Sequence, residues 1–578
     1  MTHMKFKKII NLALIFLIAS SILSMTTTLA MEDKNDQPSL NDINTINRVV
    51  VFSLDAFRYD YLLRTEDAPT FEWFKEQGVT AAYSLPSNPS VTAINHVSII
   101  TGNQPNVHGI MGNSFFDWED MKTYSMFTDA SDPYRDTNTG LHLLQTKPSV
   151  IHAEENDVKT AVLAWPYVDY GTNYEGIAPT YVYDYDWFGA NNLRTDKGIA
   201  GKTADVIIAD PEVKLVFSWL PAVDSVGHYS GPESPNVKTV IETAVDTALR
   251  TFFEKLDSAG LLEETVVILT SDHGMAEVSD SYYFLEEKQF YLDAVGNTSI
   301  EPYIVHDAPV EFLYFFGETN ASKVEEFGSY LKGQPGIQTV YVNDENAVID
   351  LDNAPRGINI SVWLEPGYSR HFGSPYLGMH GYLNDNDEMK GFFMAAGPGI
   401  EPDSTVGGIN NVDIAPTALN MLGLDAGFDT SGTILSSIFG TRTTAFSYPD
   451  MYAPTITKVT INPTGDPPAG SEVGISVKVN EYGTIALAEA EISISNGTTT
   501  SVDLVDIGGN NTLFGTLGKF EEDQTVTVTV TVEDGLGLQD ISDPIIFTVG
   551  APEKTSYSLI SLLSLILVIP FVQKRKRN

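Results

Sequence analysis

Four short, largely apolar runs constrain the fold of this chain more than any other feature of its sequence. The runs lie at Val49–Leu54, Thr160–Ala164, Val213–Trp219 and Thr265–Thr270. A strand that is apolar on both sides must be buried on both faces, which is typical of parallel sheets covered by helices. Between the last two runs, the segment Asn236–Ser258 is predicted to be a helix, because apolar residues recur at four-residue steps: Val240, Ala244, Ala248, Phe252 and Leu256. Buried strands that alternate with helices predict an α/β domain, with a mostly parallel sheet and helices on both faces.

After about residue 450 the sequence becomes typical of an all-β domain. The region 454–549 is rich in Thr, Val, Ile and Gly, and turn pairs such as Asn496-Gly497 and Asp534-Gly535 separate short alternating runs such as Thr525–Val532. This pattern predicts a β-sandwich of the immunoglobulin or fibronectin type. We expect it to serve as a spacer, with carbohydrate or protein binding as the alternative.

Both ends of the chain have the composition of targeting segments. Residues 1–30 combine a basic start, an apolar stretch and the small-residue end Thr28-Leu29-Ala30, which predicts a secretory signal peptide; an uncleaved N-terminal anchor is the alternative. Near the other end, the apolar run 557–572 is followed by a basic tail at 573–578. We expect this run to anchor the protein in the membrane, with its body extracellular at the cell surface. A sorting tail that is processed, which would give a secreted protein, is the alternative.

Polar stretches predict linkers between these regions. The expected order is a signal peptide at 1–30, a linker at 31–46, the α/β domain at 47–445, a linker at 446–453, the β-sandwich at 454–549, a linker at 550–556, the apolar helix at 557–572 and a basic cytoplasmic tail at 573–578.

The composition excludes several kinds of function. The chain has no cysteine, which excludes disulfides, cysteine-ligated zinc, iron–sulfur clusters and thiol nucleophiles. With 76 acidic and 34 basic residues, its formal net charge is −42. A body this acidic repels the phosphate backbone of nucleic acids, so we expect no binding of DNA or RNA polymers.

Acidic and histidine side chains follow three of the predicted strands. Asp55 comes directly after the first apolar run, Asp272 and His273 follow the last one, and Asp224 and His228 follow the third. Open α/β sheets place their binding sites at the carboxyl ends of such strands. Asp and His are also ligands for zinc and similar divalent ions. Since an isolated Asp-His pair is more often part of a surface loop, the prediction of a metal site rests on all three groups together.

These residues belong to a longer series of motifs. In chain order, the motifs are Val51–Asp55, Pro89–His96, His108–Asn113, the Asp-x-x-Gly-His-x-x-Gly-Pro stretch Asp224–Pro232, Ser271–Met275, His380–Tyr382 and Val412–Thr417. Together they resemble the type I phosphodiesterase/nucleotide pyrophosphatase family of the alkaline phosphatase superfamily, from about Val50 to Gly423. One motif alone is a weak signal, but all of them in order make a strong one. The resemblance implies an alkaline-phosphatase-like α/β fold and a hydrolase.

The resemblance also implies two divalent ions and a threonine nucleophile. By it, one ion is held by Asp224, His228 and His380, and the other by Asp55, Asp272, His273 and the Thr92 oxygen. Zinc is the expected metal, with manganese as the alternative. Thr92 attacks phosphorus and forms a phosphothreonine that water then hydrolyses, while Asn113 donates hydrogen bonds to the phosphate. The histidines inside the motifs that are not implied as ligands, His96 and His108, are expected to brace loops.

The expected activity is hydrolysis of phosphodiester or pyrophosphate bonds in nucleotides or related small phosphodiesters. A phosphomonoesterase or phosphonate hydrolase of the same superfamily and a catalytically silent surface adhesion protein are the alternatives. Many members of the family carry an aromatic residue directly after the nucleophile, whereas Ala93 follows Thr92 here. On the other side of the substrate pocket, Trp165 and Tyr167 resemble an aromatic wall for a nucleobase. Core packing is the alternative for Trp165 and for Trp219.

Overall fold

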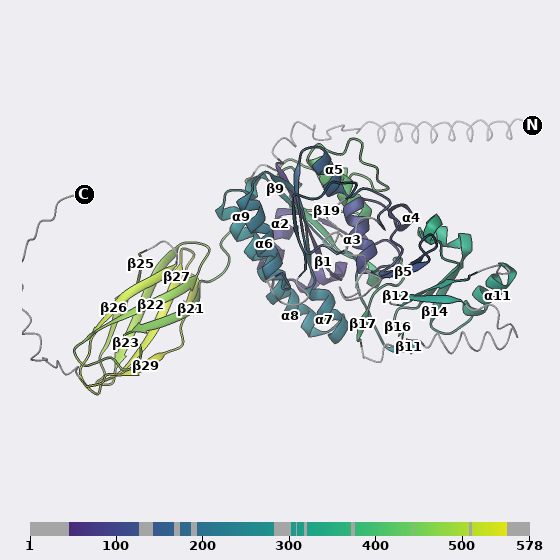
Figure 1. Ribbon diagram of the computed structural model, residues 1–578. Coiled ribbons are helices and arrows are strands. Elements are labelled where there is room, and N and C mark those ends of the chain that lie inside the picture. The colour runs from purple at the N-terminus through teal and green to yellow at the C-terminus, as the bar shows by residue number, and fades with distance from the viewer. Residues whose placement is uncertain are drawn as a thin grey trace, which may run out of the picture. The chain divides into compact units, whose positions relative to one another are not determined.

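The computed structural model divides the chain into two units, the first ending at Tyr448 and the second starting at Pro449 (Figure 1). It describes residues 46–125, 143–166, 174–185, 193–282, 302–307, 309–316, 321–370, 376–442, 444–507 and 511–551. The predicted signal peptide at 1–30 lies outside the described residues.

The predicted apolar runs form strands of one eight-stranded sheet in the first unit. Across the sheet, the order is β19 (Ser404–Val406), β2 (Gly78–Ala81), β18 (Phe393–Ala396), β9 (Thr265–Thr270), β1 (Arg48–Leu54), β8 (Val213–Leu220), β6 (Lys159–Leu163) and β7 (Tyr181–Tyr183). Neighbouring strands are parallel except at β18, which is antiparallel to β2 and β9. Every residue of β1 and β9 is buried. The four buried strands and the mostly parallel sheet are therefore confirmed.

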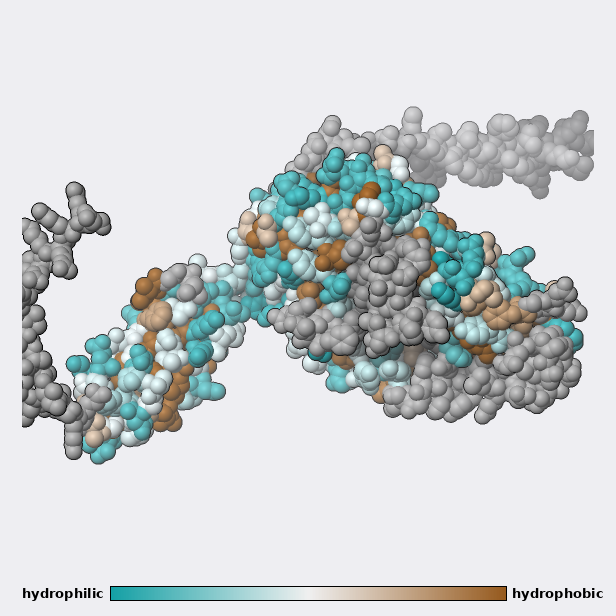
Figure 2. Space-filling view, viewed as in Figure 1, coloured by the Kyte–Doolittle hydropathy of each residue, from teal (hydrophilic) through white to brown (hydrophobic). Residues whose placement is uncertain are grey.

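Helices cover both faces of this sheet. In Figure 1, α6 (Asp196–Ala209) and α9 (Asp246–Ser258) lie on one side, and α3 (Thr92–Thr101) and α5 (Ser149–Glu155) lie on the other. This arrangement confirms the α/β architecture. The described surface of the unit is mostly hydrophilic in the view of Figure 2, in keeping with the acidic composition.

The helix predicted over 236–258 forms in three consecutive pieces. They are α8 (Pro235–Val240), a π-helical turn, η3 (Ile241–Val245), and α9. In α9 the predicted apolar positions Ala248, Phe252 and Leu256 are buried, as expected. Before it, the buried residues are Val237, Ile241 and Val245 instead of the predicted Val240 and Ala244. The wider π turn shifts the buried face along the helix by one residue.

A smaller sheet in the first unit was not predicted. Its four antiparallel strands run in the order β12 (Tyr303–Asp307), β13 (Val310–Tyr314), β15 (Ile360–Leu364) and β14 (Ile337–Val342). The helix α11 (Ala321–Leu331) packs against it through Phe327 and Leu331, which share an apolar cluster with Val340 and Val362. This sheet positions Asp307, at the end of β12, beside the site described below.

The described residues of the second unit form two antiparallel sheets. One contains β21 (Thr455–Asn462), β22 (Glu472–Asn480), β26 (Thr512–Lys519) and β25 (Val505–Asp506); the other contains β24 (Thr499–Asp503), β23 (Ile485–Ile494), β27 (Thr525–Asp534), β28 (Gln539–Ile541) and β29 (Ile545–Thr548). Alternate residues of β27 from Val526 to Val532 are buried, as the alternating sequence predicts. The assignment to the immunoglobulin or fibronectin type stays a prediction.

The predicted localisation, at the cell surface through a C-terminal membrane anchor, is corrected by the structure. Among the residues that it describes, no helix combines the length and the apolar character needed to cross a bilayer. The apolar run at 557–572 lies outside these residues.

Candidate active site and metal centre

The predicted ligands converge at the carboxyl ends of the central strands. Three of them directly follow β1 or β9, Asp224 and His228 lie on α7 (Ala222–Ser230) after β8, and His380 follows the short strand β17 (Gly378–Met379). They form two groups, and within each group one ligand atom per residue lies within 4.8 Å of the others. The Asp224 group consists of Asp224, His228 and His380, and the Asp55 group consists of Asp55, Asp272 and His273. Some of these residues lie hundreds of positions apart in the sequence, and the fold brings them together.

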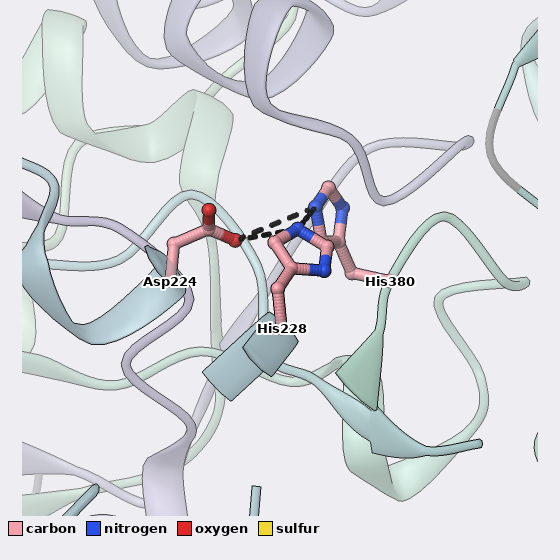
Figure 3. A group of neighbouring side chains, drawn as sticks. All are labelled: Asp224, His228 and His380. Atoms are coloured by element: carbon pink, nitrogen blue, oxygen red, sulfur yellow. Dashed lines mark hydrogen bonds and ion pairs between the residues drawn. The ribbon is translucent and has the colours of Figure 1, made fainter. Parts of the chain in front are cut away.

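In the Asp224 group, three ligand atoms face a common point (Figure 3). Asp224 Oδ1 lies 3.3 Å from His228 Nε2 and 3.5 Å from His380 Nε2. The two Nε2 atoms are 3.2 Å apart. Each ring holds a backbone carbonyl through its Nδ1, His228 that of Gly378 at 2.8 Å and His380 that of Ser90 at 3.1 Å. Because a carbonyl only accepts, both Nδ1 atoms carry hydrogen, and the two Nε2 atoms face each other and Asp224 Oδ1. Burial lowers the pKa of His380 well below its ordinary value, whereas at His228 the charge of Asp224 and its hydrogen bond outweigh burial and raise the pKa.

The Asp55 group lies beside the first one, with the rings of His273 and His380 stacked at 3.8 Å. His273 Nε2 is 3.1 Å from Asp272 Oδ2 and 3.6 Å from Asp55 Oδ1. His273 donates its Nδ1–H to the carbonyl of Gly274 at 2.9 Å, which leaves Nε2 as the free lone pair. All three side chains are buried. The group therefore presents two carboxylates and one imidazole nitrogen in a dry site.

The electrostatics of both groups fit divalent cations. Burial, reinforced by the charge of Asp272, raises the pKa of Asp55 well above its usual range, and burial raises the pKa of Asp272 to about 8. Burial lowers the pKa of His273 to about 3. Asp55 Oδ1, Asp224 Oδ1 and Asp272 Oδ2 are buried and have no hydrogen-bond partner among the described residues. Buried carboxylate oxygens without hydrogen-bond partners, facing imidazole nitrogens, are a donor set suited to zinc or a similar ion.

Thr92 and Asn113 lie next to the Asp55 group. Thr92 is the first residue of α3 and donates its hydroxyl to His273 Nε2 at 3.2 Å. The backbone N–H of Ala93 donates to Asn113 Oδ1 at 2.9 Å. This contact uses the amide oxygen of Asn113, so its two N–H groups remain as donors. A hydroxyl, an amide donor and the N-terminus of a helix thus meet beside the predicted metal ligands, an arrangement suited to a phosphate group.

Two residues that support the site were missed in these roles. Trp219 donates its Nε1–H to Asp55 Oδ2 at 2.8 Å, so it orients a predicted ligand. Asp307 accepts the backbone N–H of Asn113 through Oδ2 at 2.8 Å and is buried. A Cβ at the preceding Gly112 would overlap that same oxygen, which accounts for glycine there. No sequence signal connects Asp307 with the loop of Asn113, since they lie 194 residues apart.

The remaining predicted residues have supporting positions or are not described. Trp165 is fully buried and donates its Nε1–H to the carbonyl of His96 at 3.2 Å, which matches the core-packing alternative. Tyr167 lies outside the described residues. His96 holds the carbonyl of Thr92 through Nδ1 at 2.8 Å, and His108 is within 3.1 Å of Ser98 Oγ. The contact of His96 thus lies within α3, while His108 contacts that helix from outside it, and their role in bracing loops stays a prediction.

A sequence model of the type I phosphodiesterase / nucleotide pyrophosphatase family matches residues 49–381. The chain belongs to this family. Membership confirms the resemblance of the motifs and identifies the chain as a hydrolase of the phosphodiesterase/nucleotide pyrophosphatase type. The matched range contains every residue of the two groups, together with Thr92 and Asn113.

Proteins similar to this chain support its assignment to the family. A pyrophosphatase/phosphodiesterase of Schizosaccharomyces pombe is 30% identical over 359 residues, which cover 60% of this chain and 71% of that protein. The bis(5'-adenosyl)-triphosphatase of Bos taurus is 28% identical over 381 residues, which cover 65% and 78%. Murine ectonucleotide pyrophosphatase/phosphodiesterase 5 has a similar structure, with a TM-score of 0.58 and 25% identity over 68% of this chain and all of that one. An inactive variant of that murine protein, solved in complex with AMP, gives a TM-score of 0.59 at 25% identity over the same shares.

Proposed function

We propose that this family enzyme hydrolyses phosphodiester or pyrophosphate bonds of nucleotides or similar small molecules through a covalent phosphothreonine on Thr92. The observation that carries the proposal is the position of the Thr92 hydroxyl, buried at the start of α3 and in contact with His273 of the Asp55 group. The Asp224 group would hold one divalent ion, and the Asp55 group with the Thr92 oxygen would hold the other. We propose zinc, because the ligands are imidazoles and carboxylates.

When bound, two divalent ions supply Lewis acidity for the attacking and leaving oxygens at phosphorus. The residues of the chain supply the nucleophile and the hydrogen bonds to the phosphate. Thr92 Oγ1 forms a bond to phosphorus as the bond to the leaving alcohol or phosphate breaks, and water later cleaves the Thr92–phosphorus bond. The side-chain N–H groups of Asn113 donate to a non-bridging oxygen as its charge grows. The backbone N–H groups at the start of α3 favour the same negative charge.

A nucleotide is the proposed substrate class because the structurally similar murine protein binds AMP. The aromatic clamp for its base would be incomplete here. Ala93, next to the proposed nucleophile, has no ring to stack on a base, and the indole of Trp165 is buried against His96. We therefore propose that the phosphate group, more than the base, determines binding. Small phosphodiesters without a base would then be substrates as well.

The test compares bis-p-nitrophenyl phosphate with p-nitrophenyl phosphate for native protein, Thr92→Ala and Thr92→Ser. We expect a preference for the diester and a loss of at least about 10³-fold in kcat for Thr92→Ala, or about 4 kcal/mol of transition-state stabilisation. The metal content of the alanine variant should stay unchanged, and Thr92→Ser should keep part of the activity. Native protein quenched during turnover should carry the substrate's phosphoryl group on the peptide that contains Thr92. Near-normal turnover by Thr92→Ala, or a strong preference for the monoester, would refute the proposal.

For the second unit, we propose the immunoglobulin or fibronectin type of β-sandwich. Support comes from its two antiparallel sheets and from an apolar core that includes Val477, Ala490, Leu513 and Val530.

A further inference from the structure

A third acidic group lies in the second unit, away from the catalytic residues in the sequence. It consists of Asp450, Glu481 and Asp534, each of which places a carboxylate oxygen within 4.8 Å of the other two. Asp450 comes shortly before β21, Glu481 directly follows β22, and Asp534 is the last residue of β27. Three negative charges that converge in this way repel one another unless a cation compensates them.

Asp534 provides the observation that points to a ligand. Its side chain is fully buried, with 0% of its surface exposed. Oδ1 accepts the backbone N–H groups of Leu536 at 2.8 Å and Leu538 at 2.9 Å, and it thereby shapes the turn after β27. Among the described residues, Oδ2 is buried without a hydrogen-bond partner, and no lysine or arginine forms an ion pair with Asp534. A buried carboxylate oxygen without a partner is costly, and a bound cation would remove that cost.

The backbone near Glu481 leaves room for the carboxylates to approach. The N–H of Gly483 donates to Glu481 Oε1 at 2.6 Å and holds that side chain in place. A Cβ at Gly483 would overlap Asp450 Oδ2 and would lie 3.2 Å from Glu481 Oε1. A side chain at Gly483 would therefore displace the carboxylate of Asp450 from its present position beside Glu481. The turn geometry and the buried oxygen of Asp534 are separate observations, and both are explained by one ion.

We propose that Asp450, Glu481 and Asp534 bind a calcium ion in the second unit. The donors are carboxylate oxygens, with no imidazole or thiolate, which suits a hard cation. Calcium accepts irregular sets of six to eight oxygens and fills the rest with carbonyls or water, whereas magnesium requires a near-ideal octahedron. Bound ion would tie the segment before β21 to the ends of β22 and β27. This site is independent of the proposed function, because none of its residues belongs to the catalytic groups.

The direct test is to measure how many calcium ions the full-length protein binds per chain. Native protein, Asp534→Asn and Glu481→Gln are stripped with chelator, dialysed against CaCl₂ at a fixed zinc concentration, and analysed for metals. Asp503→Asn, an exposed position on β24, is the matched control for loss of one charge. We expect native protein and the control to hold one more calcium per chain than either variant. Equal calcium in native protein and both variants would overturn the proposal, and so would a site filled by MgCl₂ but not by CaCl₂.

Thermal unfolding gives a second readout that is independent of metal counting. All six tryptophans precede residue 449, so tryptophan fluorescence follows the first unit alone, while calorimetry follows both. Calcium should raise the melting temperature of a calorimetric transition that tryptophan does not report, and this rise should vanish in Asp534→Asn. If Asp534→Asn fails to fold, the partly exposed Glu481→Gln must show the same loss. Hydrolysis of bis-p-nitrophenyl phosphate should be unchanged in both variants, so a failure of the calcium site is distinct from a failure of the proposed catalysis.

Discussion

Replacing Asp196 by asparagine should change how the stability of the first unit depends on pH. This carboxyl group is only 3% exposed. Its Oδ1 accepts the N–H of Ala222 at 3.2 Å, and its Oδ2 has no hydrogen-bond partner among the described residues. Ala222 is the first residue of α7, the helix that carries Asp224 and His228. Asp196 therefore holds the start of the helix on which two of the predicted metal ligands lie. Burial raises the pKa of Asp196 from 3.8 to about 7.

The sign and size of the effect follow from this pKa. Between pH 4 and 7 the unfolded chain loses the proton of Asp196 while the folded chain keeps it. The unfolded state therefore binds fewer protons, so the free energy of unfolding falls as the pH rises, and the loss is complete above about pH 7. At about 1.4 kcal/mol for each pKa unit, the full loss is about 4 kcal/mol, of which about 2 kcal/mol falls between pH 5 and 7 and about 3 kcal/mol between pH 5 and 8. Asparagine cannot ionise, so it removes the loss, although its buried amide costs about 1–3 kcal/mol at every pH.

Urea unfolding followed by tryptophan fluorescence measures this effect in the first unit, where all six tryptophans lie. At constant metal concentration, the stability of Asp196→Asn relative to native protein should rise by about 3 kcal/mol from pH 5 to pH 8. Asp205→Asn is the matched control, since Asp205 lies on the same helix but pairs with Lys255 at the surface. A difference between Asp196→Asn and native protein that stays constant within about 0.5 kcal/mol over this range would refute the reasoning.

Two further predictions concern the residues that orient the site. Trp219→Phe removes the N–H that holds Asp55 Oδ2, so metal affinity should fall about 10–100-fold in titrations of chelator-treated protein; an unchanged affinity would contradict this role. Asp307→Ala removes the acceptor of the Asn113 N–H, so kcat should fall about tenfold with little change in KM. The positioning role predicts that this loss disappears when Asn113 is already alanine, and an equal loss in that background would argue against it.

The central sheet could be predicted because each of its inner strands carries its own signal. The runs at Val49–Leu54 and Thr265–Thr270 are mostly apolar on both sides of the strand, and strands of this kind need cover on both faces. The smaller sheet lacks such a signal: its buried strands Val310–Tyr314 and Ile360–Leu364 are interrupted by Glu311 and Ser361, and its strand Ile337–Val342 mixes buried and partly buried residues. The π turn at Ile241–Val245 was also beyond prediction, because a helical periodicity of four residues assumes regular geometry.

The site residues divide in the same way. The ligands could be proposed because they directly follow recognisable strands or stand in a motif, as Asp55 and His380 do. Asp307 could not be proposed, because its partner Asn113 is a backbone N–H, and a backbone contact places no requirement on the residue type. Trp219 was expected either to stack on a base or to fill the core. Its indole N–H instead donates to the carboxylate of Asp55. This contact depends on the rotamer of the Trp219 side chain in the folded protein, which the sequence does not show.

The histidines and the carboxylates of the centre are held by different means. His228, His273 and His380 each donate to a backbone carbonyl, so the fold itself sets which nitrogen faces the site. The carbonyl that holds His380 belongs to Ser90, two residues before Thr92, so one hydrogen bond links a ligand of the Asp224 group to the loop of the proposed nucleophile. The carboxylates have no comparable support at their inner oxygens, which remain buried without hydrogen bonds. The fold therefore orients the nitrogen ligands in advance, and it leaves the inner oxygens of the carboxylates available to the cations proposed for this site.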